Sequence, residues 1–125
     1  MSDPWIFSNP AASWLDATLE KSAGGVEKLQ LVKWLRKSLT IQQAGEVMEL
    51  ADLRIRAAKK FSRAAEMFFT DRQLQQATGE TISKYKARRF ATFRTVADLC
   101  CGIGGDAIAM DAHQDVHLVD LDPHA

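Results

Sequence analysis

Apolar side chains recur at helical spacing through residues 1–60, and this pattern predicts a helical N-terminal region. A first helix follows Asn9-Pro10, takes Ser13 as its N-cap and ends at Gly24-Gly25. A second helix is predicted from Val26 to about Ser38. Residues 1–60 are therefore expected to be a helical N-terminal region.

The clearest periodicity belongs to a third helix, which begins after the candidate N-cap Thr40. Its apolar residues follow the i, i+3, i+4, i+7 order that places side chains on one helix face. They are Ile41, Ala44, Val47, Met48, Ala51, Ile55 and Ala58. We expect this face to lie in the core.

Residues 61–94 are predicted to connect the helical region to a sheet. Within them, residues 66–69 fit either a short strand or a helix end, and Thr70-Asp71 fits the cap of a following turn. Phe68 and Phe69 are interpreted as core residues, with stacking on a base as the alternative. A further helix is expected from Thr78, with Ile82, Tyr85 and Phe90 facing inward and Lys84, Lys86, Arg88 and Arg89 facing mostly outward.

The pattern changes after residue 94, where two short apolar runs replace the helical spacing. Thr95-Val96-Ala97 leads into a glycine-rich stretch, and a second run, Val116-His117-Leu118-Val119, ends in two acids. Strand, glycine turn and helix N-terminus form the order that a nucleotide-type cofactor site requires. We therefore predict an α/β chain in which residues 95–125 are the first β-α-β of a Rossmann-like sheet.

The formal net charge of zero hides a partition along the chain. All 16 Lys and Arg residues lie in residues 1–94 with ten acids, which leaves six acids and no Lys or Arg in residues 95–125. This asymmetry suggests a basic region that faces an anionic partner and an acidic region that holds a cofactor. Chance, with mutual attraction of the two halves, is the alternative.

Other compositional features restrict the class of protein. The N-terminus lacks the basic start and apolar segment of a signal peptide, and no Cys/His cluster has metal-ligand spacing. The two cysteines, Cys100 and Cys101, are adjacent. We therefore expect a reduced, cytoplasmic protein without a membrane span or a metal site.

The glycine-rich stretch carries the candidate chemistry. Gly102 and Gly104 permit positive φ and a close approach of ligand to backbone, and Gly105-Asp106 is expected to open a helix. The carboxylate of Asp98, just before the glycines, favours a cationic ligand over a pyrophosphate. The same stretch also satisfies the pattern G-x-G-x-x-A, so the glycines alone leave NAD(P) open.

Two segments together resemble a known family. Asp98-Leu99-Cys100-Cys101-Gly102-Ile103-Gly104-Gly105-Asp106 and Val116-His117-Leu118-Val119-Asp120-Leu121-Asp122-Pro123 are similar to the first two motifs of class I S-adenosylmethionine-dependent methyltransferases. The resemblance is greatest to the trimethylguanosine-synthase-like group and its bacterial relatives with a THUMP-like C-terminal domain. Phe68-Phe69-Thr70 and Gln76-Ala77-Thr78-Gly79-Glu80-Thr81-Ile82 also resemble that group's Thr-Pro-Glu-x-Ile element, with Gly79 in place of proline. The whole resemblance covers about residues 60–125.

The resemblance implies roles for seven residues. Asp98 would interact with the methionine moiety of the cofactor, and Gly102, Gly104 and Gly105 would line that moiety with backbone. Asp120 would accept hydrogen bonds from the ribose hydroxyls. Asp122 would lie at the adenine edge or stabilise the turn with Pro123, and Thr78 would touch the cofactor from the preceding segment.

The implied reaction is transfer of a methyl group to a nitrogen of an RNA base. The family's Asn/Asp-Pro-Pro-aromatic turn does not occur before Ala125, so no catalytic residue is assigned. We expect Ala125 to be a truncation point and the chain alone not to methylate a substrate.

The anionic partner implied by the basic residues is RNA. A run without acids supplies the candidate contacts, and a solvated helix face is the alternative. These contacts are Lys84, Lys86, Arg88, Arg89 and Arg94. Two other functions stay open, a fragment of an NAD(P)-dependent oxidoreductase and a non-catalytic helical module that binds RNA or protein.

Overall fold

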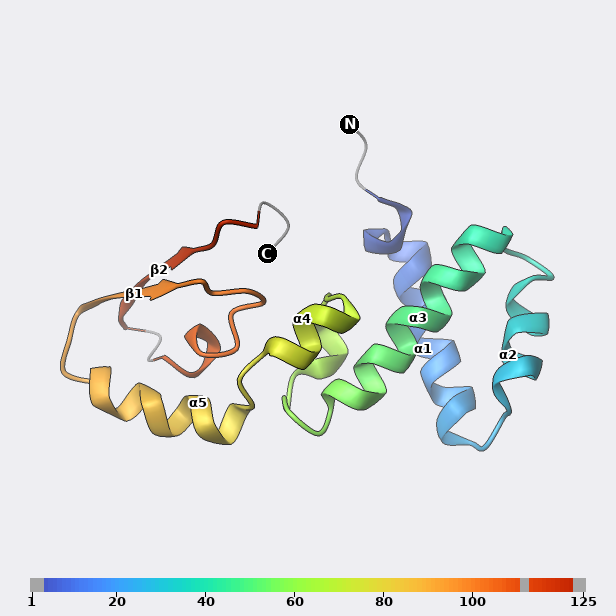
Figure 1. Cartoon of the computed structure of the whole chain (residues 1–125). Helices are drawn as coiled ribbons and strands as arrows, with labels where there is room; N and C mark the ends of the chain where they lie inside the picture. The colour runs from blue at the N-terminus through green and yellow to red at the C-terminus, as the bar shows by residue number, and fades with distance from the viewer. Residues whose placement is uncertain (1–3, 111–112, 123–125) are drawn as a thin grey trace. The chain divides into compact units, whose positions relative to one another are not determined.

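The computed structural model describes residues 4–110 and 113–122 as a mixed α/β chain that is mostly helical. The chain divides into two compact units, Met1–Ile55 and Arg56–Ala125. In the first unit, which is blue to green in Figure 1, the elements are η1 (Trp5–Phe7), α1 (Asn9–Ala23), α2 (Lys28–Leu35) and most of α3 (Ile41–Ala57). Among the described residues, no helix combines the length and the apolar character needed to cross a membrane.

The helix ends of the first unit follow local capping signals. Ser8 caps α1, because its side chain accepts a hydrogen bond from the Ala11 N–H at 3.3 Å. The prediction that Ser13 is the cap was wrong: Ser13 lies inside α1 and donates to the Asn9 carbonyl. The helix ends at Gly24, as expected, and Gly25 continues with a φ of 89°.

The predicted cap of α3 is confirmed. The Thr40 hydroxyl accepts a hydrogen bond from the Gln43 N–H at 3.1 Å, and the Gln43 side chain accepts one from the Thr40 N–H at 3.1 Å. This reciprocal pair satisfies two backbone donors at the helix start. The helix α2, in contrast, is shorter than the predicted range 26–38.

The core of the first unit is formed where α1, α2 and α3 meet. It contains Leu15, Leu35, Ala44, Val47, Leu50 and Ala51. The expected core positions Ile41 and Ile55 are 70% and 48% exposed, so their assignment was wrong. Ala58 is also exposed and lies beyond the end of α3. The buried stripe instead runs from Val47 through Leu50 to Arg54, whose side chain is covered.

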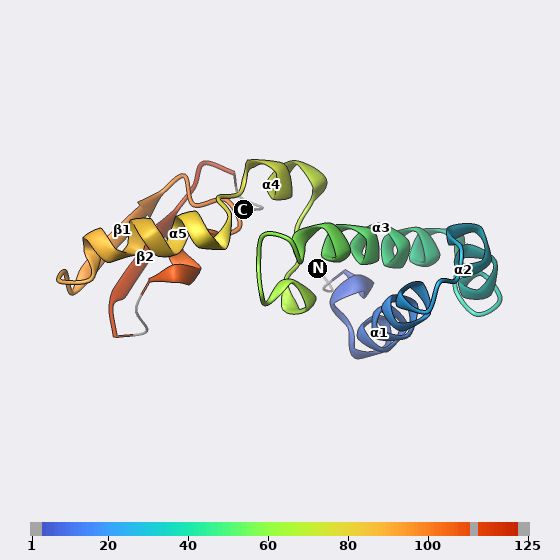
Figure 2. The same cartoon turned by 90° about the horizontal axis from the view of Figure 1, so that it is seen from below.

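The second unit contains the short sheet. Its elements are η2 (Ala64–Glu66), α4 (Asp71–Gln76), α5 (Glu80–Ala87), η3 (Arg88–Phe90), β1 (Thr95–Leu99), η4 (Ala107–Ala109) and β2 (Asp115–Val119). The strands pair in parallel, from Thr95 opposite Asp115 to Leu99 opposite Val119. Figures 1 and 2 show α5 running along one face of this strand pair.

The two predicted strands are therefore present and parallel, but the helix expected between them is not seen. In the described residues after the glycine-rich stretch, the only helical element is the single 3-10 turn η4. Its end is set by Met110, whose φ of −69° and ψ of 154° are extended. The opening of an α-helix at Gly105-Asp106 was thus a wrong prediction for residues 105–110.

Residues 66–69 adopt neither of the two predicted conformations in full. The turn η2 ends at Glu66, and Met67 is extended without belonging to a strand. Thr70 is a cap, as predicted, since its hydroxyl accepts from the Gln73 N–H and the Gln73 side chain accepts from the Thr70 N–H. Phe69 is buried, and Phe68 is 44% exposed.

The orientation of α5 differs from the prediction. Ile82, Tyr85 and Phe90 are 55%, 60% and 40% exposed, so the expected inward face was wrong. The buried residues are Ser83 and Ala87. Small side chains on this face let α5 approach the glycine-rich stretch closely, and a polar contact of Ser83 holds it there.

The start of α5 shows the backbone conformation of Gly79, the residue before the helix. The helix begins at Glu80, two residues after the predicted Thr78, with Gly79 as its N-cap. Gly79 has a φ of −65°, which is the value that a proline ring fixes. The Glu80 carboxylate accepts hydrogen bonds from Ser62, and these bonds lower the pKa of Glu80. The glycine therefore keeps a backbone conformation that suits proline.

Candidate functional site

A pocket lies at the carboxyl ends of the two strands. Because β1 and β2 are parallel, the segments after Leu99 and Val119 emerge at the same edge of the sheet, where ligands of open α/β sheets bind. The helix α4 forms another wall. The pocket has a volume of about 780 Å³ and is lined by Thr70, Arg72, Gln73, Gln76, Ala77, Thr78, Cys100, Cys101, Gly102, Ile103, Gly105, Asp106, Asp120, Leu121 and Asp122.

The turn after β1 is held in an unusual backbone conformation. Cys100, Gly102 and Gly104 have positive φ values of 61°, 53° and 78°. The Cys101 N–H donates to the Val119 carbonyl at 2.9 Å, and the Gly104 N–H donates to the Cys101 carbonyl at 2.9 Å. Left-handed backbone is routine for glycine and costly for other residues, so Cys100 carries local strain.

Asp120 fixes this turn to the end of β2. Its carboxylate accepts hydrogen bonds from the Asp122 N–H at 2.9 Å and from the Gly102 N–H at 2.8 Å. These two bonds, with that from Asp122 as the larger effect, lower the pKa of Asp120. Asp120 is therefore an ionised acceptor at the pocket wall.

Asp98 has a buried carboxylate oxygen without a hydrogen-bond donor among the described residues. It is the fourth residue of β1, opposite Leu118. Its Oδ2 is buried and accepts no hydrogen bond from any described residue. Burial, and then the neighbouring Asp106 charge, raise the pKa of Asp98. A buried acceptor without a donor is rare in folded proteins and calls for a partner.

Asp106 connects the glycine-rich stretch to the helix α5. Its carboxylate accepts hydrogen bonds from Thr78 Oγ1 at 3.3 Å and from Ser83 Oγ at 3.2 Å. Lys86 Nζ lies 3.4 Å from the same carboxylate. Thr78 and Asp106 both line the pocket, so these contacts hold two segments of the pocket wall together and fix them to α5.

Gly105 is required by the close approach of two segments. A Cβ atom at this position would lie 2.9 Å from the Thr78 carbonyl oxygen and 3.5 Å from Phe61 Cζ. The distance to Phe61 is an ordinary packing contact, whereas the distance to the Thr78 carbonyl, a backbone atom, is too short for a side chain. Gly105 therefore brings residues 102–106 against the segment before α5.

Five of the seven predicted cofactor-binding residues line the pocket. They are Thr78, Gly102, Gly105, Asp120 and Asp122. Gly104 lines an adjoining hollow of about 420 Å³ that shares Gly102, Asp120 and Asp122 with the pocket. Asp98 lines neither hollow and lies on β1, two residues before Cys100.

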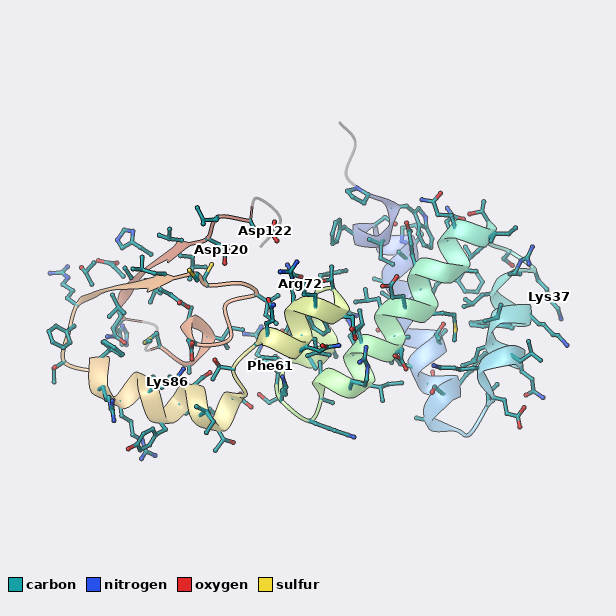
Figure 3. All side chains as sticks on the ribbon, viewed as in Figure 1. Lys37, Phe61, Arg72, Lys86, Asp120 and Asp122 are labelled. Carbon is teal, nitrogen blue, oxygen red and sulfur yellow. The ribbon has the colours of Figure 1, made fainter. Side chains whose placement is uncertain are left out.

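Sequence reasoning missed the wall that α4 supplies. Arg72, Gln73 and Gln76 come from this helix, and Figure 3 shows the Arg72 side chain directed toward the segment that carries Asp120 and Asp122. Phe68 lines the adjoining hollow. A polar helix after a capping box has no local signal for a ligand, so only the tertiary arrangement identifies these residues.

The cysteines and the described acids do not suggest nucleophilic or metal chemistry. Burial, followed by the charges of Asp120 and Asp98, raises the pKa of the Cys101 thiol, which disfavours the reactive thiolate. Within residues 4–110 and 113–122, no group of three or more His, Cys, Asp or Glu side chains is arranged to hold a metal ion. The arrangement is suited to binding through hydrogen bonds and charge.

The basic residues are concentrated in the second unit. Residues 56–94 hold ten Lys and Arg against three acids, whereas residues 1–55 hold six against seven. Two of the five candidate RNA contacts already have carboxylate partners: Lys84 Nζ lies 3.6 Å from a Glu80 oxygen, and Lys86 pairs with Asp106. The Lys86 side chain therefore reaches toward the glycine-rich stretch as well as to solvent. Arg89 lies over the Tyr85 ring, and Arg88 and Arg94 are exposed.

Comparison of the chain with protein-family models, with curated proteins and with solved structures finds no match.

Proposed function

We propose that the second unit belongs to an S-adenosylmethionine-binding, Rossmann-like domain of a methyltransferase. The proposed substrate is a nitrogen of an RNA base. In this proposal Asp98 and the backbone of residues 102–105 bind the methionine moiety. Asp120 accepts hydrogen bonds from the ribose, and Asp122 and Thr78 complete the site.

The observation that carries the proposal is the meeting of three separate segments at one strand edge. Thr78, Gly102 and Asp120 lie far apart in the sequence, yet all three line one pocket. Beside it, Asp98 offers a buried acceptor that no described residue satisfies. An ammonium group is a strong partner for such a carboxylate. S-adenosylmethionine combines an ammonium with a ribose, and in this proposal these groups supply the donors for Asp98 and Asp120.

The charge of the pocket favours S-adenosylmethionine over a dinucleotide. The lining residues include three aspartates and one arginine, and Asp106 is the aspartate paired with Lys86. A pyrophosphate would be repelled by Asp120 and Asp122, whereas a ligand with a sulfonium and an ammonium would be attracted. The acidic lining thus favours S-adenosylmethionine over NAD(P), although the glycine spacing suits both.

The residues of this chain act by binding and positioning. Bound S-adenosylmethionine supplies an electrophilic methyl group on its sulfonium. Asp120, fixed by the Gly102 and Asp122 N–H groups, holds the ribose end, and Asp98 holds the amino-acid end. Fixing both ends orients the transferable methyl group, and such positioning is a large part of catalysis in group-transfer enzymes.

Titration of the full chain with S-adenosylhomocysteine and with NADH tests the proposal, and only the former is expected to bind.

The RNA part of the proposal rests on the exposed arginines that follow α5. Because Lys84 and Lys86 already have carboxylate partners, Arg88, Arg89 and Arg94 are the better candidates for phosphate contacts. Tyr85, under Arg89, is 60% exposed and offers a ring for base stacking. The surface is thus both cationic and aromatic.

Changing Arg88, Arg89 and Arg94 together to Gln is expected to weaken binding of a single-stranded RNA. Three lost phosphate contacts should make the slope of log affinity against log salt less steep by about 2. Fluorescence anisotropy over a salt series measures this slope. The single variant Lys84→Gln is the control and should leave the slope unchanged. An unchanged slope in the triple variant would exclude these arginines as RNA contacts.

A further inference from the structure

Arg72 is the one cation among the residues that line the pocket. It lies on α4, across the pocket from the ends of the strands, and its side chain extends toward the segment with Asp120 and Asp122 (Figure 3). The side chain is exposed, so it does not contribute to the core of the unit. The guanidinium is therefore available to contact a ligand in the pocket.

Five of the other basic residues of the second unit already have partners. Arg56 pairs with Asp71, Arg63 with Glu66, Lys84 with Glu80 and Lys86 with Asp106. Lys60 donates to the carbonyls of Leu74 and Ala77. Arg72 forms no ion pair with a described residue, although three aspartates line the same pocket.

We propose that Arg72 binds the carboxylate of the ligand's amino-acid group and so fixes the direction in which the ligand lies. This inference rests on the proposed function, because it takes the ligand to be S-adenosylmethionine. A guanidinium binds a carboxylate through two parallel hydrogen bonds, which gives both strength and orientation. The acids of the pocket leave the carboxylate only this cationic partner among the lining side chains.

The proposed pairing of Arg72 with the ligand's carboxylate explains how one pocket accepts a ligand with charges of both signs. The ammonium and the ribose hydroxyls are donors, and the proposed acceptors on the strand side are Asp120 in the pocket and Asp98 beside it on β1. The carboxylate is an acceptor, and Arg72 is the donor on the helix side. A phosphate would also be attracted to Arg72, but its additional negative charge would meet Asp120 and Asp122.

The test compares two ligands that differ in the carboxylate alone. Calorimetry measures the affinity of the full chain for S-adenosylhomocysteine and for its decarboxylated analogue, which keeps the amine. Wild type is expected to prefer S-adenosylhomocysteine by roughly 10- to 100-fold, as for a hydrogen bond between charged groups. In Arg72→Gln this preference should disappear, through weaker binding of S-adenosylhomocysteine and unchanged binding of the analogue. Arg72→Lys should restore part of it.

The control is Lys59→Gln, which makes the same change of charge at an exposed site outside the pocket. It should keep the full preference for the carboxylate. If Arg72→Gln weakens both ligands equally, or neither, Arg72 does not bind the carboxylate. If wild type binds neither ligand, the proposed function itself is wrong, which is a different result. NADH as a third ligand separates a carboxylate from a phosphate, since a phosphate-binding Arg72 would give NADH an affinity that Arg72→Gln removes.

Discussion

Asp98→Asn is expected to weaken S-adenosylhomocysteine binding by roughly 10- to 100-fold, the usual cost of losing a hydrogen bond between charged groups. The change keeps the size of the side chain and removes its charge. In the structure, Oδ2 of Asp98 is buried without a donor from any described residue, so the ammonium of the ligand is its proposed partner. Calorimetry at neutral pH measures the loss.

The same variant should be more stable than wild type when no ligand is present. Burial and the Asp106 charge raise the pKa of Asp98, so the folded protein binds this proton more readily than the unfolded chain. Ionised Asp98 therefore destabilises the free protein at pH values above its unfolded pKa. The advantage of Asp98→Asn should be present at neutral pH and should disappear at a pH low enough to protonate wild-type Asp98.

Thermal melts of the two proteins across this pH range check the sign of the effect. A variant with higher stability and lower affinity would identify Asp98 as a binding residue that lowers the stability of the free protein. A variant that loses stability at neutral pH would instead show that Asp98 is structural. Unchanged affinity would remove Asp98 from the site.

Gly105→Ala is expected to lower the free energy of unfolding of the second unit by about 1–3 kcal/mol, as for other substitutions that overfill a packed site. The new Cβ would lie 2.9 Å from the Thr78 carbonyl oxygen, a backbone atom, and 3.5 Å from the buried ring of Phe61. Either residues 102–106 or the segment before α5 must move. Because Thr78 and Gly105 both line the pocket, S-adenosylhomocysteine binding should weaken as well.

The matched control is Gly45→Ala in α3. A Cβ at Gly45 meets no atom within 4 Å, and alanine is favoured over glycine inside a helix by about 0.5–1 kcal/mol. The same substitution should therefore stabilise at one site and destabilise at the other. Urea unfolding, together with amide hydrogen exchange of peptides from residues 60–110, measures both effects. Native-like protection of those peptides in Gly105→Ala would show that the space at Gly105 is not needed.

The features that sequence reasoning predicted are those set by neighbouring residues. Thr40 and Thr70 are caps because each has a glutamine three residues later that completes the hydrogen-bonded pair. The strands begin at Thr95 and Asp115, within one residue of the apolar runs. The positive φ values at Gly102 and Gly104 follow from glycine itself.

The features that were missed depend on contacts between distant segments. The expected inward face of α5 was wrong because Asp106, twenty or more residues away, binds Ser83 and Lys86 and turns that side of the helix to the glycine-rich stretch. Ile82 and Tyr85 are left exposed as a result. Arg72 was missed for a similar reason, since its place in the pocket is set by the packing of α4 and by no sequence motif.

Calorimetric titration of the full chain with S-adenosylhomocysteine, with NADH as the parallel ligand, decides whether the pocket at the strand ends binds the proposed cofactor. Asp120→Ala is the matched variant, because Asp120 both holds Gly102 and faces the proposed ribose site. We expect saturable binding of S-adenosylhomocysteine to wild type, at least about 10-fold weaker binding to Asp120→Ala, and no binding of NADH. Binding of NADH in preference to S-adenosylhomocysteine, or affinity for S-adenosylhomocysteine that Asp120→Ala leaves unchanged, would contradict the proposal.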